Sequence, residues 1–87
     1  MIPVEDVKKS MRIGHNLSDD EIQRNIETAL LDMSRVGVNV DKESELVDKA
    51  CELYCKAQFD YQGKGESYLK NYEKLRDGMS MSGEHGV

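Results

Sequence analysis

The sequence contains few of the residues that mark specialised classes of protein. Its 87 residues include two cysteines, one proline, one phenylalanine and no tryptophan. Two cysteines do not make a disulfide scaffold, and their scarcity agrees with a reducing compartment. A chain of this length is expected to form one domain. Its core is thin, because a small chain buries only about 60–65% of the surface that it exposes when unfolded.

Long hydrophobic runs and basic clusters are also missing. No apolar stretch approaches the roughly 18 residues that a membrane span needs. The first residues, MIPVEDVKKSMRIG, lack the hydrophobic segment of a signal peptide. We therefore expect a protein made in a cytoplasm, without membrane contact. The net charge is −5, and no segment gathers enough lysine and arginine to bind a phosphate backbone tightly.

Apolar residues recur instead at helical spacing along most of the chain. The one alternating segment, residues 36–41, has no strand to pair with, so we interpret it as a packed linker. We predict an all-α fold: a small bundle of about four helices with a long central third helix. The helical domain is expected to span residues 1–78, and residues 79–87 to form a flexible C-terminal tail.

The second helix has the clearest start. The segment Ser18-Asp19-Asp20-Glu21 matches a capping box, with Ser18 as the N-cap and Glu21 reaching back from the third helical position. Leu17 and Ile22 occupy the two positions of a hydrophobic staple. The first helix is expected to begin at Pro3 and to end at Gly14.

The third and fourth helices are predicted from apolar stripes. Asp41 is the expected N-cap of a third helix from about Lys42 to Tyr61. Beside its predicted core face lies a second row of residues, Cys51, Cys55 and Phe59, along the shoulder of that face. The fourth helix is expected to end before Gly78. The predicted core faces comprise Leu46, Val47, Ala50, Leu53, Tyr54, Ala57 and Tyr61 in the third helix, and Tyr68, Leu69, Tyr72 and Leu75 in the fourth.

Cys51 and Cys55 raise the question of a metal or redox site. Residues four apart on a helix have Cβ atoms about 5–6 Å apart, whereas a disulfide needs about 3.5–4.5 Å. Two thiolates would supply half of a zinc site, and only His15 and His85 are available to complete it. We interpret both cysteines as small buried hydrophobes, reduced and without metal.

No pattern points to catalysis. The sequence shows no nucleophile with a nearby base and a third orienting group. The turn Gly63-Lys64-Gly65 is too short for a phosphate loop. We therefore expect neither enzymatic activity nor a cofactor. Two apolar residues lie off the predicted core faces, Leu31 on the second helix and Phe59 on the polar side of the third, and both are candidate contacts with neighbouring subunits or partners.

The order of these segments resembles a known family. VEDVKKSMRIGHNLSDDEIQRNIETA, then a helix ending LYCKAQFDY, then SYLKNYEKLRDGMSM resemble the head–tail connector proteins of tailed bacteriophages, which are often described as DNA-packaging proteins. The likeness runs from Val4 to Met81 and rests on order and spacing.

The resemblance implies a virion part at the head–tail junction, made in the bacterial host. Family members are helical and assemble as a ring, usually of about a dozen copies, beneath the portal protein. The ring extends the DNA channel, through which DNA passes without sequence-specific binding, and presents a surface to the stopper or tail-completion protein. A virion part would thus contact the portal, its own copies and the stopper.

Two other classes remain open. Residues of the second and third helices can be read as a small helix-turn-helix regulator, but the predicted recognition helix would begin Lys42-Glu43-Ser44-Glu45, which is a poor DNA-reading surface. A host-directed protein-interaction module is the other alternative. Gene neighbourhood would distinguish the latter from a connector.

Overall fold

A computed structural model describes residues 1–11, 18–41 and 44–81 of the chain. These residues form four α-helices and a short 3₁₀ helix, with no β-strand in the described ranges, which confirms the all-α prediction. The helices are α1 (Val4–Met11), α2 (Asp19–Arg35), α3 (Glu45–Gln58) and α4 (Gly65–Ser80), and the 3₁₀ helix η1 (Tyr61–Gly63) joins α3 to α4.

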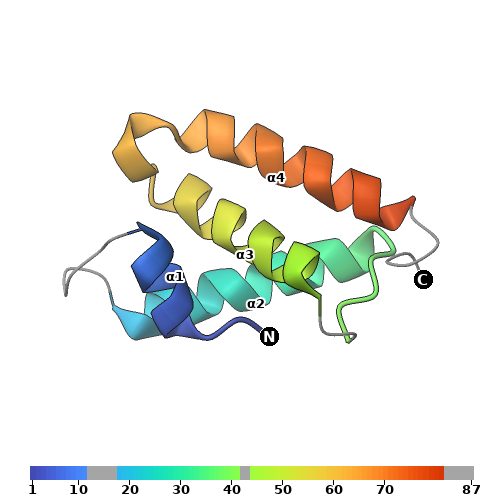
Figure 1. The fold of residues 1–87 in the computed structure, drawn as a ribbon, viewed down its shortest axis with the longest axis horizontal. Coiled ribbons are helices and arrows are strands. Elements are labelled where there is room, and N and C mark those ends of the chain that lie inside the picture. The colour runs from blue at the N-terminus through green and yellow to red at the C-terminus, as the bar shows by residue number, and fades with distance from the viewer. Residues whose placement is uncertain (12–17, 42–43, 82–87) are drawn as a thin grey trace.

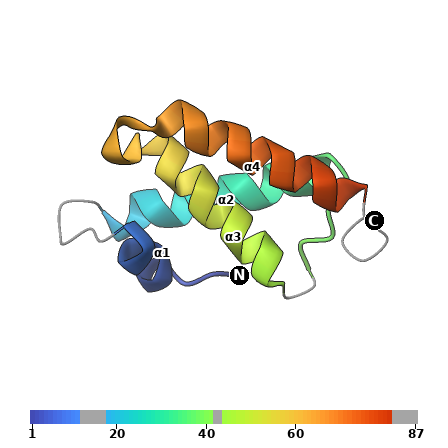
Figure 2. The same ribbon diagram turned by 45° about the horizontal axis from the view of Figure 1, so that its top comes forward.

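Helix α3 lies in the middle of the bundle. It contacts α1, α2 and α4, and it runs antiparallel to α4 after the tight connection through η1 (Figure 1). The turned view in Figure 2 shows α4 along one side of α3 and α2 behind it. The central position predicted for the third helix is therefore confirmed.

The core is built from the apolar stripes of all four helices. Helix α2 buries Ile22, Ile26, Ala29 and Met33, as its helical spacing predicts. The connection after α2 adds Val38, which is buried although it lies outside any helix. The whole buried set is Ile2, Val7, Met11, Ile22, Ile26, Ala29, Met33, Val38, Val47, Ala50, Cys51, Leu53, Cys55, Tyr72 and Met79.

The start of α2 follows the predicted cap in part. The Ser18 Oγ accepts a hydrogen bond from the backbone N–H of Asp20 at 3.1 Å, so Ser18 is the N-cap. No return hydrogen bond from the Glu21 side chain is found among the described residues, where Glu21 is exposed. Leu17 and Gly14 lie outside these residues, so the staple and the end of the first helix stay predictions.

The end of α2 is a Schellman motif. The backbone N–H of Val38 donates to the carbonyl oxygen of Met33 at 2.9 Å, and that of Gly37 donates to Ser34 at 3.1 Å. Gly37 has a φ of +95°, a conformation that side chains with a Cβ rarely adopt. This geometry turns Val38 back into the core, and the expected packed linker is confirmed.

The predicted start of the third helix is wrong. Helix α3 begins at Glu45, and its N-cap is Ser44, whose Oγ accepts from the backbone N–H groups of Leu46 and Val47. Asp41 instead donates its own N–H to the side chain of Asn39 in a local turn. Serine and aspartate are about equally good N-caps. The start of the helix is therefore decided by which choice lets the following apolar side chains pack in the core.

The third helix is also not long. Helix α3 has 14 residues, fewer than the 17 of α2 and the 16 of α4. It ends at Gln58 because the chain turns at Asp60, which has a left-handed φ of 49°. Tyr61 therefore belongs to η1, and the expected continuous helix to Tyr61 is interrupted.

The buried face of α3 is rotated relative to the prediction. Cys51 and Cys55 are fully buried at its centre and do not form a shoulder. Leu46, expected in the core, is exposed at the first turn. In α4, Tyr72 is buried and Leu69 is exposed. Because α1 and α2 both pack on α3, its buried arc extends toward the cysteine side.

Helix α4 continues past its predicted end. It passes through Gly78 to Ser80, and Met79 is buried in the core. The boundary predicted between residues 78 and 79 is therefore wrong, since residues 79 and 80 belong to the helix. Residues 82–87 of the expected tail lie outside the described part of the chain.

Two glycines of α4 give a paired prediction. A Cβ at Gly65 would lie 2.7 Å from the Asp60 Oδ1 and 3.0 Å from the carbonyl oxygen of Ala57, whereas one at Gly78 would meet nothing within 4 Å. We expect Gly65→Ala to lower the free energy of unfolding by about 1–2 kcal/mol through overpacking. Gly78→Ala should raise it by about 0.5–1 kcal/mol through helix propensity. Urea denaturation measures both, and a stabilised Gly65→Ala would contradict this turn geometry.

Candidate functional site

The predicted contact residue Leu31 lies on the outer face of α2. Its side chain is 72% exposed, on the side of the helix opposite the buried stripe. The neighbouring side chains on that face, Glu27, Thr28 and Arg35, are exposed too. The structure thus places a large apolar side chain in a polar surface, as the sequence predicts.

The environment predicted for Phe59 is wrong. Phe59 is the C-cap of α3 and is partly buried against the hydrophobic core. It follows Cys55 by four residues, on the same row of the helix as the buried Cys51 and Cys55, and that row faces the core. A role for Phe59 in contacts with partners stays a prediction, but an isolated aromatic on a polar face is not what the structure shows.

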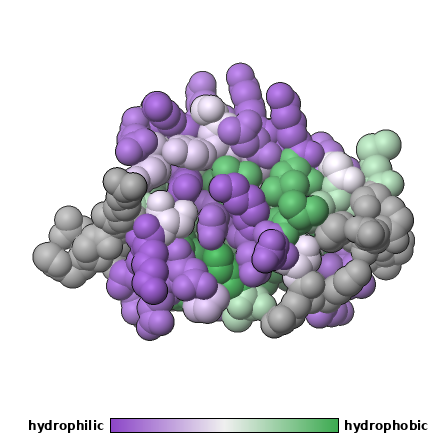
Figure 3. All heavy atoms as spheres, in the orientation of Figure 1, coloured by the Kyte–Doolittle hydropathy of each residue, from purple (hydrophilic) through white to green (hydrophobic). Residues whose placement is uncertain are grey.

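Four exposed apolar residues were missed as contact candidates. Leu46 on α3 is 44% exposed, Leu69 on α4 is 38% exposed, and Met1 and Met81, outside the helices, are 66% and 87% exposed. Figure 3 shows apolar side chains reaching the surface between α3 and α4. The helical spacing assigned Leu46 and Leu69 to the core, because each lies at the edge of an apolar stripe.

Cys51 and Cys55 are free thiols buried in the core. Burial raises the pKa of each thiol to about 12, with a smaller contribution at Cys51 from Cys55 and at Cys55 from Glu52. Thiolates are the reactive and metal-binding form of cysteine, so this environment favours an inert role. Their state of oxidation and metal binding in solution stays a prediction.

Substitution of Cys51 tests its role as a buried hydrophobe. Cys51→Ala leaves a small void and should lower the free energy of unfolding by about 1 kcal/mol. Cys51→Ser buries a polar hydroxyl in the same apolar site and should cost about 2 kcal/mol. Urea denaturation of the two variants should show that the serine variant is the less stable. Stoichiometric zinc by elemental analysis, or rapid thiol labelling of the native protein, would contradict the interpretation.

A polar cluster between α2 and α4 was missed by sequence reasoning. The Asp32 Oδ2 accepts hydrogen bonds from the Tyr72 hydroxyl at 2.7 Å and from the Arg76 Nη1 at 2.8 Å. Its Oδ1 accepts from the Arg35 Nη2 at 2.7 Å, and the Arg76 Nε reaches Asp77 at 2.9 Å. Asp32 and Arg76 lie 44 positions apart in the chain, so local spacing carries no signal of their contact.

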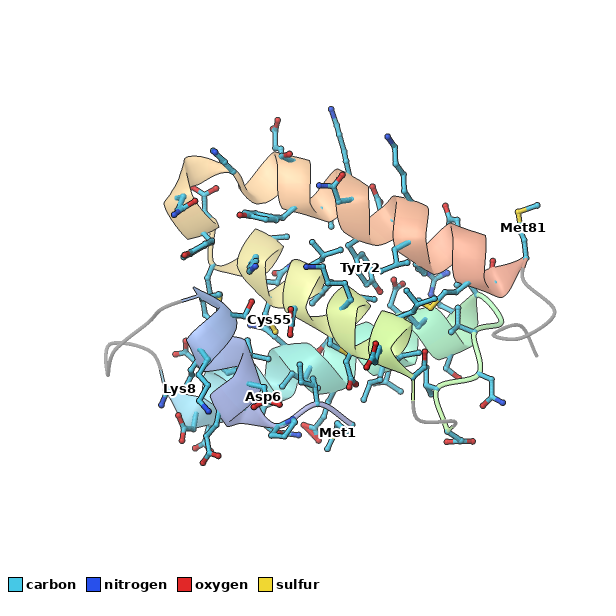
Figure 4. The ribbon with its side chains drawn as sticks, in the orientation of Figure 1. Met1, Asp6, Lys8, Cys55, Tyr72 and Met81 are labelled. Atoms are coloured by element: carbon cyan, nitrogen blue, oxygen red, sulfur yellow. The ribbon has the colours of Figure 1, made fainter. Side chains whose placement is uncertain are left out.

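The electrostatics of this cluster favour its charged form. Burial alone raises the pKa of Asp32, but the hydrogen bonds from Tyr72, Arg35 and Arg76 outweigh it and lower the pKa to about 2. Burial and the Asp32 carboxylate raise the pKa of the Tyr72 hydroxyl. Figure 4 shows Tyr72 pointing from α4 into the bundle. Through these hydrogen bonds and ion pairs the cluster joins α2 to α4.

The described residues contain neither a cluster of metal ligands nor a membrane-spanning helix. Within these ranges, no three histidine, cysteine, aspartate or glutamate side chains lie where they could hold one metal ion. His15 and His85 lie outside the described residues. None of the helices that the structure describes is both long enough and apolar enough to cross a bilayer.

An open hollow beside the turn before α4 is lined by Asp60, Lys64 and Lys70, among others. The Asp60 Oδ1 accepts from the backbone N–H of Gly65 at 2.8 Å and so occupies the start of α4. The hollow is open to solvent, and one of its two acidic residues, Asp60, already serves the helix terminus. The exposed apolar residues on α2, α3 and α4 are therefore the strongest candidates for function.

Comparisons with known proteins show no relative of this chain. No family model matches the chain, and neither a curated protein nor a solved structure matches it well enough to count as similar.

Proposed function

We propose that the chain is a small helical assembly protein of the head–tail connector kind, which forms a ring beneath a phage portal. The observation that carries this proposal is the exposure of large apolar side chains on separate helices. Leu31 projects from α2, Leu46 from α3 and Leu69 from α4. A single exposed leucine is ordinary, but three on different helices of an 87-residue chain supply more than one contact surface.

A ring needs two different surfaces on each subunit, because head-to-tail contacts close a cycle. The α2 surface around Leu31 is one candidate. The surface of α3 and α4 that carries Leu46 is the other, and it replaces the surface first expected at Phe59. The small core also supports an assembly role, because a marginally stable domain gains stability from binding its neighbours.

The resemblance in sequence order supplies the rest of the proposal. It assigns the ring to the junction of head and tail, between the portal and the stopper or tail-completion protein, with DNA passing through the centre. The acidic net charge of −5 fits such a channel, because a basic lining would retain DNA through release of counterions.

A helix-turn-helix regulator has less support. The two helices of that motif are joined by a turn of about 3–4 residues, whereas residues 36–44 separate α2 from α3. Helix α3 also begins with Glu45 and carries Asp48 in its first turn. Both acids would repel the phosphate backbone at the end of the helix that reads DNA.

Co-expression with a portal protein tests the proposal. The chain, with a purification tag, is produced together with the portal protein encoded nearest to its own gene. We expect the two proteins to co-purify, and electron microscopy to show an added ring on the portal. A gene neighbourhood without phage structural genes, or a portal that purifies alone, would contradict the proposal and favour a host-directed interaction module.

Surface variants sharpen the same experiment. Leu46→Asp should keep the helical circular dichroism signal, because Leu46 is exposed, and should reduce portal attachment or ring closure. Asn71→Asp introduces the same charge at an exposed position of α4 and serves as the matched control. Equal attachment by both variants would remove the α3 surface from the proposal.

A further inference from the structure

The outer face of α2 carries two opposite charges at equal distances on either side of one leucine. Glu27 lies four residues before Leu31 and Arg35 four residues after it. Residues four apart form a continuous ridge on a helix surface. The ridge therefore presents an acid, a large apolar side chain and a base in that order.

All three side chains of this ridge are accessible. Leu31 is strongly exposed, Glu27 is exposed, and the Arg35 side chain is 69% exposed. Arg35 donates from Nη2 to the Asp32 Oδ1 at 2.7 Å, which leaves most of its five N–H donors available. Glu27 makes no ion pair within the described part of the chain.

We infer that this ridge pairs with the same ridge of a second copy in a twofold-symmetric, antiparallel contact. A twofold axis beside Leu31 brings the two leucines together. It also places Glu27 of each copy beside Arg35 of the other. Because an isologous contact repeats every pair, both flanking pairs join opposite charges.

The charges determine which partner fits the ridge and in which direction the partner helix runs. A parallel pairing in the same register would place Glu27 against Glu27 and Arg35 against Arg35, and both contacts would be repulsive. Only the antiparallel arrangement brings opposite charges together at both ends of the ridge. A face of this kind is complementary to itself, so a second copy of this chain is its occupant.

The contact is small, and the dimer is correspondingly weak. Helix α2 has 17 residues and is about 25 Å long. One crossing of two such helices buries less than the roughly 800 Å² per partner of a typical stable complex. We expect a dissociation constant between about 0.1 and 1 mM.

This inference does not depend on the proposed function. A twofold contact is complete after two copies, so it occupies Leu31 and keeps it from any head-to-tail contact until the pair dissociates. A dimer that forms without portal binding, or portal binding without a dimer, therefore separates the two proposals.

Charge reversal tests the pairing in the full chain, by sedimentation equilibrium and concentration-dependent NMR shifts of α2. Glu27→Arg alone and Arg35→Glu alone should each weaken self-association on the order of tenfold, because two attractive pairs become repulsive. A mixture of the two variants should associate at least as well as the wild type. Each substituted side chain then meets an opposite charge on the other copy.

Matched controls separate pairing from net charge and from folding. Glu73→Arg and Lys74→Glu make the same charge changes on the exposed face of α4 and should leave association unchanged. Leu31→Asp keeps the pair of Arg35 with Asp32 and should abolish the dimer with an unchanged circular dichroism spectrum. A wild-type chain that stays monomeric to about 1 mM, a Leu31→Asp variant that still dimerises, or a mixture no better than its components would each overturn the inference.

Discussion

Asp32→Ala is expected to lower the free energy of unfolding by about 3 kcal/mol. The carboxylate accepts hydrogen bonds from Tyr72, Arg35 and Arg76 and joins α2 to α4. Its loss leaves the buried hydroxyl of Tyr72 without its strongest acceptor and the mostly buried guanidinium of Arg76 without its partner across the bundle. Removing one member of a buried pair costs about 3–5 kcal/mol, and the partial exposure of Asp32 places this case at the lower end.

Urea denaturation followed by circular dichroism measures this effect. Asp32→Asn keeps the shape and one acceptor oxygen, so it should cost less than the alanine variant. Tyr72→Phe removes only the hydroxyl and should cost about 1–1.5 kcal/mol. The double variant Asp32→Ala with Tyr72→Phe should fall short of the sum, because the two groups share one hydrogen bond. Full additivity would show that the two side chains do not interact in solution.

The same carboxylate sets an expected dependence on acid. The pKa of Asp32 is about 2 in the folded chain, below its ordinary value of 3.8. Ionised Asp32 therefore stabilises the fold fully above about pH 4, and this contribution is lost as the pH falls toward 2. Denaturation of the wild type and of Asp32→Asn between pH 5 and 2 compares the two. The wild type should lose more stability over this range, and parallel curves would contradict the assignment.

Met79→Ala is expected to lower the free energy of unfolding by about 2–3 kcal/mol. Met79 is buried in the core although it follows Gly78, near the end of α4. Truncating a buried methionine removes apolar contacts and leaves a cavity, and such changes cost about 2–5 kcal/mol. The low end applies because the last turn of a helix can relax into the space.

Met81→Ala is the matched control, two residues further along the chain. Met81 is almost fully exposed and points away from the bundle (Figure 4). Its substitution should change the free energy of unfolding by less than about 0.5 kcal/mol. Equal effects at Met79 and Met81 would mean that α4 ends earlier in solution, as the sequence alone predicts.

The errors at the start of α3 and at the end of α4 have a common physical cause. Ser44 and Asp41 are both good caps, and Gly78 is a common stop signal, so local chemistry offers more than one boundary. The core decided between them. Starting α3 at Glu45 accompanies burial of Val47, and extending α4 past Gly78 brings Met79 into the core. Burial of a large side chain contributes about 1.5–3 kcal/mol, more than either local signal.

The sequence by itself determined the number of helices, the N-cap at Ser18 and the buried stripe of α2, because these depend on residues within a few positions of each other. It also predicted that Leu31 lies away from the core. The burial of Cys51 and Cys55 was predicted as well. Only the tertiary structure decided that the two cysteines lie at the centre of the buried face of α3 and not along its shoulder, that Phe59 packs against the core, and that Asp32 meets Tyr72 and Arg76. These outcomes depend on which helices surround α3 and on contacts between residues about 40 positions apart. Helical periodicity describes one helix at a time and carries no information about its neighbours.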